Sequence, residues 1–203
     1  MNEPGSQVSE RWVGWRRSVD LDEYDARWEA MRARGEASHG EADAVERLTI
    51  EHGAPRRVLD AGCGTGRLAI ELNNRGFDVV GADLDPDMVE RARRKSTAVE
   101  WLVADLASHR WETDFGIVVL AGNVFNFCAP GSGAAIALRL ASAVAPGGLL
   151  VAGWTQESER DSYRAEQLVN DAPELEHVVT WSTWEGDPWT SGSTYAVVVL
   201  RRG

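Results

Sequence analysis

The segment from residue 58 to residue 67 carries the strongest chemical pattern in the chain. It reads Val-Leu-Asp-Ala-Gly-Cys-Gly-Thr-Gly-Arg, follows an apolar run and opens a helical pattern. Gly62, Gly64 and Gly66 stand at alternate positions. Glycine lets a ligand lie against the bare backbone, and the helix beyond directs free N–H groups to the same place. The segment is therefore predicted to cradle a small ligand.

Two acidic residues indicate what that ligand carries. Asp60 precedes the glycines, where a carboxylate would repel a pyrophosphate but suits an ammonium group. Asp83 ends the next predicted strand, where an acidic side chain can accept both hydroxyls of a ribose. The G-x-G-x-G spacing also differs from the G-x-G-x-x-G loop that admits a pyrophosphate. A ribonucleoside with a cationic tail and no phosphate fits these features.

Alternating apolar and helical stretches between Pro55 and Trp154 predict the elements that position these residues. Continuous valine-rich runs are typical of strands covered on both faces, hence of a parallel sheet, and right-handed crossovers make it doubly wound. Strands are expected at 57–61, 78–82, 101–104, 117–121 and 149–153, and helices at 67–75, 86–95 and about 132–145. Asp85 is expected to cap the second helix, and the Pro-Gly-Gly turn at 146–148 to stop the third.

The flanking segments are expected to add a helical cap and a strand pair. Leu21, Tyr24, Trp28 and Met31 share one face of a helix that Gly35 would end. A second helix is expected over 41–51, a polar helix over 155–170, and antiparallel strands at 175–184 and 193–201. We therefore expect one α/β domain with a Rossmann-like, mostly parallel seven-stranded sheet, divided into a cap (1–54), a core (55–154) and a C-terminal part (155–203).

Four motifs in this order resemble the class I S-adenosylmethionine-dependent methyltransferases over about residues 55–155. They are the glycine segment 58–66, Gly-Ala-Asp-Leu-Asp-Pro-Asp-Met at 81–88, Ala-Asp-Leu at 104–106 and the 146–148 turn. The resemblance implies S-adenosylmethionine as cofactor and S-adenosylhomocysteine as product. Asp60 and the glycines would line the methionine portion, Asp83 the ribose, Leu84 and Met88 the adenine, and Asp105 the adenine amino group. The other residues expected at the cofactor are Ala61, Cys63, Arg67, Ala104, Leu106 and Ala121.

Plainer interpretations of these positions stay open. The glycines could form only a tight turn, and Asp105 could be a simple loop carboxylate. Asp83 could cap the following helix, although Asp85 before Pro86 fits that role better. The side chain of Cys63 is expected to pack, with only its backbone at the cofactor.

The acceptor of the methyl group is expected to be a small molecule. The net charge of −11 disfavours a phosphate backbone. Residues 121–128 also lack the Asn/Asp-Pro-Pro-aromatic run of methyltransferases that act on nucleic-acid amino groups. Asn123 would stand near the reacting methyl group, or else close its own loop. His39 and Glu41 are weak candidates for a base, or else a capping cluster. Tyr24 and Trp28 could face a sulfonium cation, or else only pack.

The remaining features concern the cellular compartment, metal binding and the oligomeric state. Cys63 and Cys128 are the only cysteines, and neither a signal peptide nor a membrane span is expected, which favours the cytoplasm. No His, Cys or Asp spacing suggests a metal. A monomer or a homodimer is compatible with the sequence, and the tryptophans at 181, 184 and 189 could line a pocket, form a dimer surface or pack the sheet. Two other functions stay open, a non-catalytic protein that binds S-adenosylmethionine and an oxidoreductase that uses NAD(P).

Overall fold

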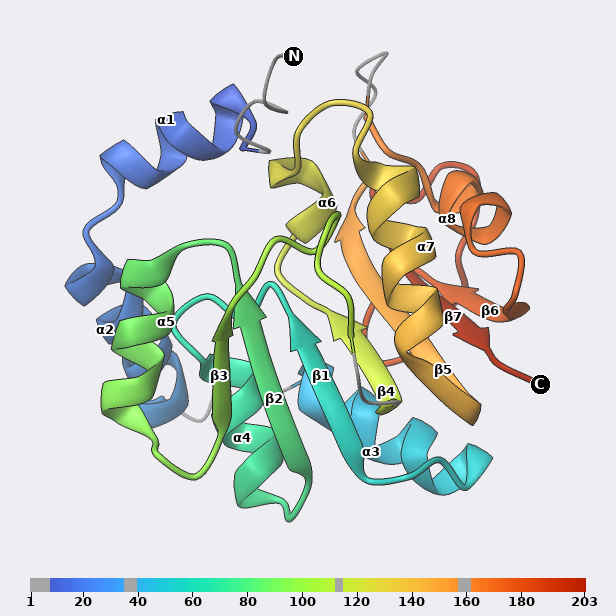
Figure 1. Cartoon of the computed structure of the whole chain (residues 1–203), viewed down its shortest axis with the longest axis horizontal. Coiled ribbons are helices and arrows are strands. Elements are labelled where there is room, and N and C mark those ends of the chain that lie inside the picture. Colours follow the sequence, from blue (N-terminus) through green and yellow to red (C-terminus); the bar gives the residue numbers. More distant parts are fainter. Residues whose placement is uncertain (1–7, 35–39, 112–114, 157–161) are drawn as a thin grey trace.

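The computed structural model describes residues 8–34, 40–111, 115–156 and 162–203 (Figure 1). A single seven-stranded sheet runs through the middle, and helices cover both of its faces. The strands are β1 (Arg57–Ala61), β2 (Asp78–Asp83), β3 (Glu100–Val103), β4 (Phe115–Leu120), β5 (Val144–Thr155), β6 (Glu176–Trp181) and β7 (Tyr195–Arg201). The helices are α1 (Glu10–Ser18), α2 (Leu21–Ala33), α3 (Gly40–His52), α4 (Arg67–Asn74), α5 (Pro86–Lys95), α6 (Val124–Phe127), α7 (Gly133–Ala143) and α8 (Ala165–Asp171).

The strand order is β3-β2-β1-β4-β5-β7-β6. Strands β1 to β5 pair in parallel with one another, whereas β7 runs antiparallel to both β5 and β6. This confirms the predicted doubly wound α/β sheet and its terminal antiparallel pair. The chain reverses its direction of travel between β1 and β4, and ligands of such sheets bind outside the carboxyl ends of the strands at that point.

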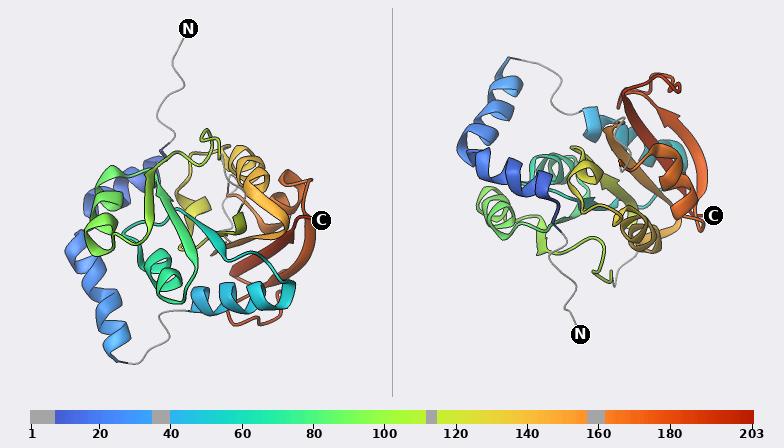
Figure 2. Two further views of the ribbon diagram at one scale, coloured as in Figure 1. Left: turned by 60° about the horizontal axis from the view of Figure 1, so that its bottom comes forward. Right: turned by 90° about the horizontal axis from the view of Figure 1, so that it is seen from above.

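Two hydrophobic layers hold the helices on the sheet. Apolar side chains of α3, α4 and α5 pack on one face, and those of α6, α7 and α8 pack on the other. Strand β4 is buried along its whole length, as its continuous apolar run predicts. Helix α3 is part of this core, because Ala42, Val45 and Leu48 are fully or almost fully buried. The segment that lies apart from the sheet is therefore α1 with α2 (Figure 2).

Ion pairs fasten α1 and α2 to α5. Arg16 on α1 binds the N-cap carboxylate of Asp85 at 2.6 Å. Asp25 on α2 binds Lys95 at 2.7 Å and accepts a hydrogen bond from the Thr65 hydroxyl at 2.6 Å. These contacts hold both helices over the carboxyl ends of the strands, beside the glycine segment.

Most expected elements of the core are present within a few residues, and the expected 86–95 helix has those bounds. The expected helix over 155–170 is confirmed only at its end, where α8 covers Ala165–Asp171, and is wrong at its start, where Thr155 still belongs to β5; residues 157–161 lie outside the described ones. The indole of Trp154 donates to the Tyr163 carbonyl at 2.8 Å, and the Gln156 side chain accepts from the N–H of Ala165 at 3.0 Å. These bonds hold Gln156 and residues 163–165 next to the end of β5.

Other differences concern the ends of elements. Strand β5 starts at Val144, so the Pro-Gly-Gly segment lies inside it. Helix α6 was not expected, and α1 lies in the expected helical cap without having been predicted as a separate helix. The proposed cap residue Gly35 lies outside the described residues. Within those residues, no helix has the length and apolar character that a bilayer span needs.

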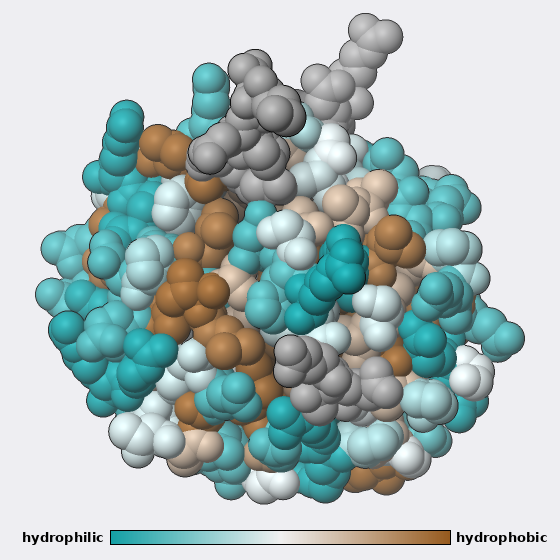
Figure 3. All heavy atoms as spheres, viewed as in Figure 1, coloured by the Kyte–Doolittle hydropathy of each residue, from teal (hydrophilic) through white to brown (hydrophobic). Residues whose placement is uncertain are grey.

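The three C-terminal tryptophans pack against other parts of the protein. Trp184 is buried and its indole donates to the Tyr195 hydroxyl at 3.1 Å. Trp181 stacks with the guanidinium of Arg47, and Trp189 packs against the core. On the face shown in Figure 3, hydrophobic residues form a band from the side of α1 toward the β2–β3 half of the sheet, with hydrophilic residues around it.

Candidate active site

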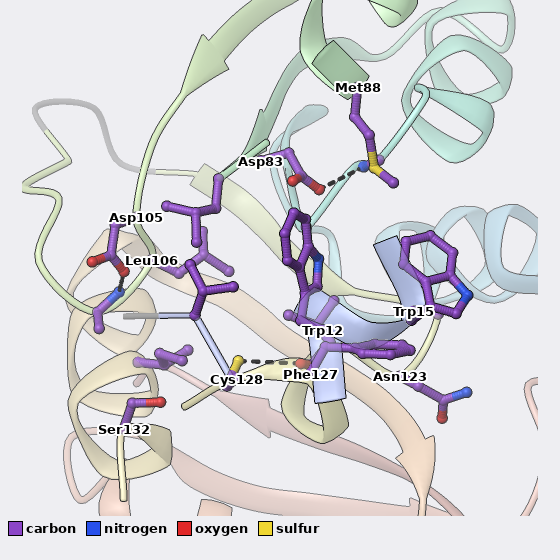
Figure 4. A pocket seen from close by; sticks show the side chains of 18 of the residues that line it. Trp12, Trp15, Asp83, Met88, Asp105, Leu106, Asn123, Phe127, Cys128 and Ser132 are labelled. Atoms are coloured by element: carbon purple, nitrogen blue, oxygen red, sulfur yellow. Dashed lines mark hydrogen bonds between the residues drawn. The ribbon is translucent and has the colours of Figure 1, made fainter. Parts of the chain in front are cut away.

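A cavity of about 410 Å³ lies at the carboxyl ends of the parallel strands, under α1 and α2. Its floor comes from the loops after β1, β2, β3 and β4, and its roof from the two N-terminal helices (Figure 4). Its lining residues are Val8, Trp12, Trp15, Tyr24, Arg27, Trp28, Gly62, Gly64, Asp83, Leu84, Met88, Asp105, Leu106, Ala107, Gly122, Asn123, Val124, Phe127, Cys128, Ser132 and Ile136. The cavity lies at the switch point of the sheet, which is the place between β1 and β4 where the chain reverses its direction of travel.

Hydrogen bonds to the neighbouring strand fix the glycine loop. The N–H groups of Gly62 and Cys63 both donate to the Ala82 carbonyl, at 2.8 and 3.0 Å. Gly64 has a φ of +53°, and a Cβ built on it would have only the Met88 sulfur within 4 Å, at 3.8 Å. Gly64 therefore presents bare backbone to the cavity, as the motif predicts.

Asp83 lines the cavity at the end of β2 and is tied to the glycine loop. Its Oδ2 accepts from the N–H of Gly64 at 2.8 Å, and its Oδ1 accepts from the N–H of Asp85 at 2.9 Å. Asp85 is the residue that caps α5, since its side chain accepts from the N–H of Asp87 at 2.8 Å. A carboxylate has about four lone pairs, so Asp83 keeps acceptor capacity for a ligand. Burial raises the pKa of Asp83 above its ordinary value.

Asp60 lies behind the glycine loop and does not line the cavity. It is only 2% exposed, and its Oδ2 has no hydrogen-bond partner among the described residues. Burial raises the pKa of Asp60 to about 7, against the lowering effect of the Arg67 guanidinium. Asp60 therefore carries a buried acceptor that a nearby cation would stabilise.

Arg67 joins the first turn of α4 to α3 and α2. Its guanidinium binds both carboxylate oxygens of Glu41 and lies 4.4 Å from the ring centre of Trp28. Both charged side chains are mostly buried. Glu41, a candidate base from the sequence, is thus engaged in a two-pronged ion pair.

The far end of the cavity is built from the loops after β2 and β3. Leu84, Met88 and Leu106 give apolar walls there. Asp105 lines this end, and it accepts from the N–H of Ala107 at 2.9 Å and from the Ser108 hydroxyl at 3.2 Å. Asp105 therefore closes its own loop, which is the plainer interpretation of the sequence, and it also lines the cavity.

Asn123 is the one described non-glycine residue with a positive φ, at +66°. Its side-chain oxygen accepts from the N–H of Thr155 at 2.7 Å, which joins the end of β4 to the end of β5. This contact is to another strand, whereas the structural alternative drawn from the sequence was a bond within its own loop. Asn123 still lines the cavity. His39, the other candidate, lies outside the described residues.

The expected cofactor residues divide into two groups. Those that line the cavity are Tyr24, Gly62, Gly64, Asp83, Leu84, Met88, Asp105, Leu106 and Asn123. Those that do not are Asp60, Ala61, Cys63, Gly66, Arg67, Ala104 and Ala121. The thiol of Cys63 is buried, and burial raises its pKa well above the ordinary value.

Sequence reasoning missed Trp12, Trp15 and Phe127. Trp12 and Trp15 project from α1 toward the part of the cavity that holds Asp83 and Met88 (Figure 4). The available signal was Ser9 as an N-cap: its hydroxyl accepts from the N–H of Trp12 at 3.0 Å. Two tryptophans three positions apart after such a cap share a helix face.

Comparisons with known proteins show which family has this fold and these motifs. A methyltransferase-domain family matches residues 58–148. The solved structure of a TehB-like SAM-dependent methyltransferase from Corynebacterium glutamicum is 32% identical, with a TM-score of 0.76 over 90% of this chain and 97% of that chain. The chain belongs to the class I S-adenosylmethionine-dependent methyltransferases.

Curated members of the methyltransferase family match a smaller part. A trans-aconitate 2-methyltransferase from Methylobacterium nodulans is 31% identical over 73% of this chain and 57% of the relative. A glycine/sarcosine N-methyltransferase from Parasynechococcus marenigrum is 33% identical over 52% of this chain and 39% of the relative. The chain spans roughly half the length of these curated relatives, and their names do not agree on one acceptor.

Proposed function

We propose that this chain moves a methyl group from S-adenosylmethionine to a small-molecule acceptor by in-line displacement. The observation that carries the proposal is Asp83, a carboxylate with lone pairs to spare on the wall of a cavity at the switch point of the sheet. An acidic residue at that strand end suits the two hydroxyls of a ribose. The resemblance noted in the sequence and the membership of the family point to the same cofactor.

The residues present fit that cofactor along the whole cavity. Asp83 would hold the ribose, and Leu84 and Met88 would pack on the adenine. Asp105 would accept from its amino group through the lone pairs that Ala107 and Ser108 leave free. When bound, S-adenosylmethionine supplies an electrophilic methyl group on a sulfonium.

Asp60 would act on the methionine end through its charge. It lies behind Gly62 rather than on the cavity wall, and its Oδ2 has no partner among the described residues. An ionised carboxylate there would favour an ammonium group beyond the loop. Arg67 and Glu41 would keep Asp60 and the start of α4 in place.

Positioning and exclusion of water are the contributions that the chain itself would make to catalysis. A well-aligned bound pair gains an effective molarity of about 10⁵–10⁸ M. The roof of Trp12, Trp15 and Tyr24 would hold the acceptor against the reacting centre and keep water out. A general base is required only for an acceptor that must lose a proton.

The class of acceptor and the cellular compartment are part of the same proposal. We infer a small molecule rather than nucleic acid as acceptor, because the net charge is −11. Both cysteines are free and mostly buried, which is compatible with the reducing cytoplasm. The described residues hold no group of three or more His, Cys, Asp or Glu that could bind a metal.

Calorimetry with three ligands tests the proposal. S-adenosylmethionine and S-adenosylhomocysteine should bind at one site, and NADH should not compete with them. Tight NADH binding with no binding of the other two would instead support an oxidoreductase. A transfer assay with a tritiated methyl group and a broad acceptor panel completes the test. Cofactor binding without transfer to any acceptor would support the non-catalytic alternative.

A further inference from the structure

Among the described residues that line the cavity, Arg27 is the one with a basic side chain. Arg27 forms no ion pair with any side chain that the structure describes. Nearby arginines on the same side of the molecule do hold carboxylates: Arg16 binds Asp85, Arg67 binds Glu41 and Arg91 binds Asp22. The unpaired charge of Arg27 therefore lies at the site rather than in the network that fastens the helices.

Two aromatic rings hold the guanidinium of Arg27 in place. Its central carbon lies 5.3 Å from the ring centre of Tyr24 and 4.9 Å from that of Trp28. Stacking on a ring face leaves the N–H edge of a guanidinium available, and that edge matches a carboxylate in two-pronged geometry. A guanidinium held in this way loses little freedom when it binds an anion.

Trp28 supplies a second unsatisfied donor beside it. The indole nitrogen of Trp28 is buried and has no hydrogen-bond partner among the described residues. An indole N–H can only donate, and leaving it buried without an acceptor is costly. An oxygen atom of a ligand in the cavity would satisfy it.

The wall next to these donors is aromatic. Trp15 packs edge-on against Tyr24 at 5.9 Å between ring centres, and Tyr24 packs edge-on against Trp28 at 6.2 Å. Phe127 lies 5.5 Å from Trp15 and closes the wall from the side of β4. Rings in such arrangements favour a flat, apolar partner.

We propose that Arg27 and Trp28 anchor a carboxylate of the methyl acceptor, and that the acceptor is a flat, aromatic carboxylic acid. This inference rests on the proposed function. The methionine carboxylate of the cofactor shares this chemistry, but it carries an ammonium one carbon away, which would lie beside the cation of Arg27. The apolar wall also suits a ring better than an amino-acid chain. Arg27 is thus a specificity-determining residue for an acidic acceptor.

The test compares an acid with its uncharged amide. Indole-3-acetate and indole-3-acetamide are titrated calorimetrically into the full chain saturated with S-adenosylhomocysteine. The acid should bind at least tenfold more tightly than the amide. In Arg27→Gln this difference should disappear, and in Trp28→Phe, which keeps a ring but loses the donor, it should shrink. Arg94→Gln, an exposed change of the same charge on α5, should behave like the wild type.

Separate outcomes overturn the inference and the proposed function. Equal binding of acid and amide by the wild type, or binding of neither at millimolar concentration, overturns the acidic acceptor. A tenfold loss of S-adenosylhomocysteine affinity in Arg27→Gln, with the preference for the acid unchanged, assigns Arg27 to the cofactor and also overturns it. Failure of the wild type to bind S-adenosylhomocysteine overturns the proposed function; the acid and amide are then compared without it. Melting temperatures confirm that each variant is folded.

Discussion

The carboxylate of Asp83 accepts a hydrogen bond from the backbone N–H of Gly64 at 2.8 Å, which ties the end of β2 to the glycine loop after β1. The second oxygen of Asp83 binds the N–H of Asp85 in the same way, at 2.9 Å. One side chain therefore sets the relative positions of two loops that line the cavity. In the proposed function the same side chain also holds the ribose, so the site is organised before a ligand enters.

Asp83→Ala should weaken S-adenosylhomocysteine binding by at least a hundredfold in calorimetry. The reason is the loss of two charge-assisted hydrogen bonds to the ribose, each worth about 1.5–3 kcal/mol. Asp78→Ala is the matched control. Asp78 is exposed and lies at the amino end of the same strand, β2, away from the cavity. Unchanged affinity in a folded Asp83→Ala variant would remove Asp83 from the ribose site.

Gly64→Val should abolish S-adenosylhomocysteine binding without unfolding the protein. A side chain at this positive φ costs about 1–2 kcal/mol, and here it would extend into the cavity because only Met88 lies near it. Gly53→Val separates strain from blockage: Gly53 has a φ of +63° and nothing within 4 Å of a built Cβ, and it does not line the cavity.

Chemical denaturation should show a similar loss of unfolding free energy in the two glycine variants, but only Gly64→Val should lose the ligand. Loss of binding in Gly53→Val as well would attribute the effect to strain rather than to the cavity.

Asp60 should make the protein less stable as the pH rises from about 4 to 7. Its pKa is raised by burial to about 7 in the folded chain, against an ordinary value of 3.8. The folded state therefore holds a proton that the unfolded state has lost, so the stabilisation is complete below the unfolded pKa. It is lost as the pH passes through the folded pKa, at about 1.4 kcal/mol per unit of pKa shift.

Asp60→Asn isolates this contribution. Unfolding free energies of the variant, measured between pH 4 and 8, should fall less with rising pH than those of the wild type. The raised pKa of Asp83 acts in the same direction in both proteins, so the difference between their curves reports mainly on Asp60. Parallel curves for wild type and variant would show that Asp60 does not titrate in this range.

Asp60 should also make cofactor binding depend on pH. If its ionised form favours the ammonium group, affinity for S-adenosylhomocysteine should rise between pH 6 and 8, and binding near pH 6.5 should release a proton. Calorimetry in two buffers of different ionisation enthalpy measures that proton. Asp60→Asn should bind more weakly and release no such proton; the same release in the variant would assign the proton to another group.

The core of the fold and one side of the cavity could be predicted because local patterns determine them. The glycine segment, Asp83 at its strand end and Asp85 before Pro86 are fixed by backbone conformation and capping, which a few neighbouring residues specify. The valine-rich runs gave a parallel sheet because both faces are covered. The seven-stranded order follows from the same regularities and the family resemblance.

The opposite side of the cavity depends on contacts between distant residues, which no local pattern records. Arg67 and Glu41 pair across 26 positions, and Asn123 reaches Thr155 across 32. The sequence predicted Glu41 and Asn123 as candidate catalytic residues because it does not show the contacts that these two side chains make with Arg67 and Thr155. Helix α1 was not separated from the rest of the expected helical cap because its sequence is mostly polar; it has no buried residue, and its tryptophans face the cavity.

Polar contacts join the two N-terminal helices to the loops that are proposed to bind the ligand, so we expect these helices to act as a lid. Arg16 binds Asp85, whose N–H binds Asp83. Asp25 on α2 accepts from the hydroxyl of Thr65, which lies between Gly64 and Gly66 in the glycine loop. A ligand that orders either loop would therefore also favour the closed position of α1 and α2.

Hydrogen exchange measures that closure. Addition of S-adenosylhomocysteine should slow exchange in residues 10–34 more than in β6, at the far edge of the sheet. The double variant Arg16→Gln with Asp25→Ala should still bind the ligand through the loops, but the slowing in residues 10–34 should shrink because the Arg16–Asp85 ion pair and the Thr65–Asp25 hydrogen bond are both lost. Arg94→Gln serves as the control on α5. If exchange in residues 10–34 of the wild type does not change when the ligand is added, α1 and α2 are a fixed roof and the proposed lid is wrong.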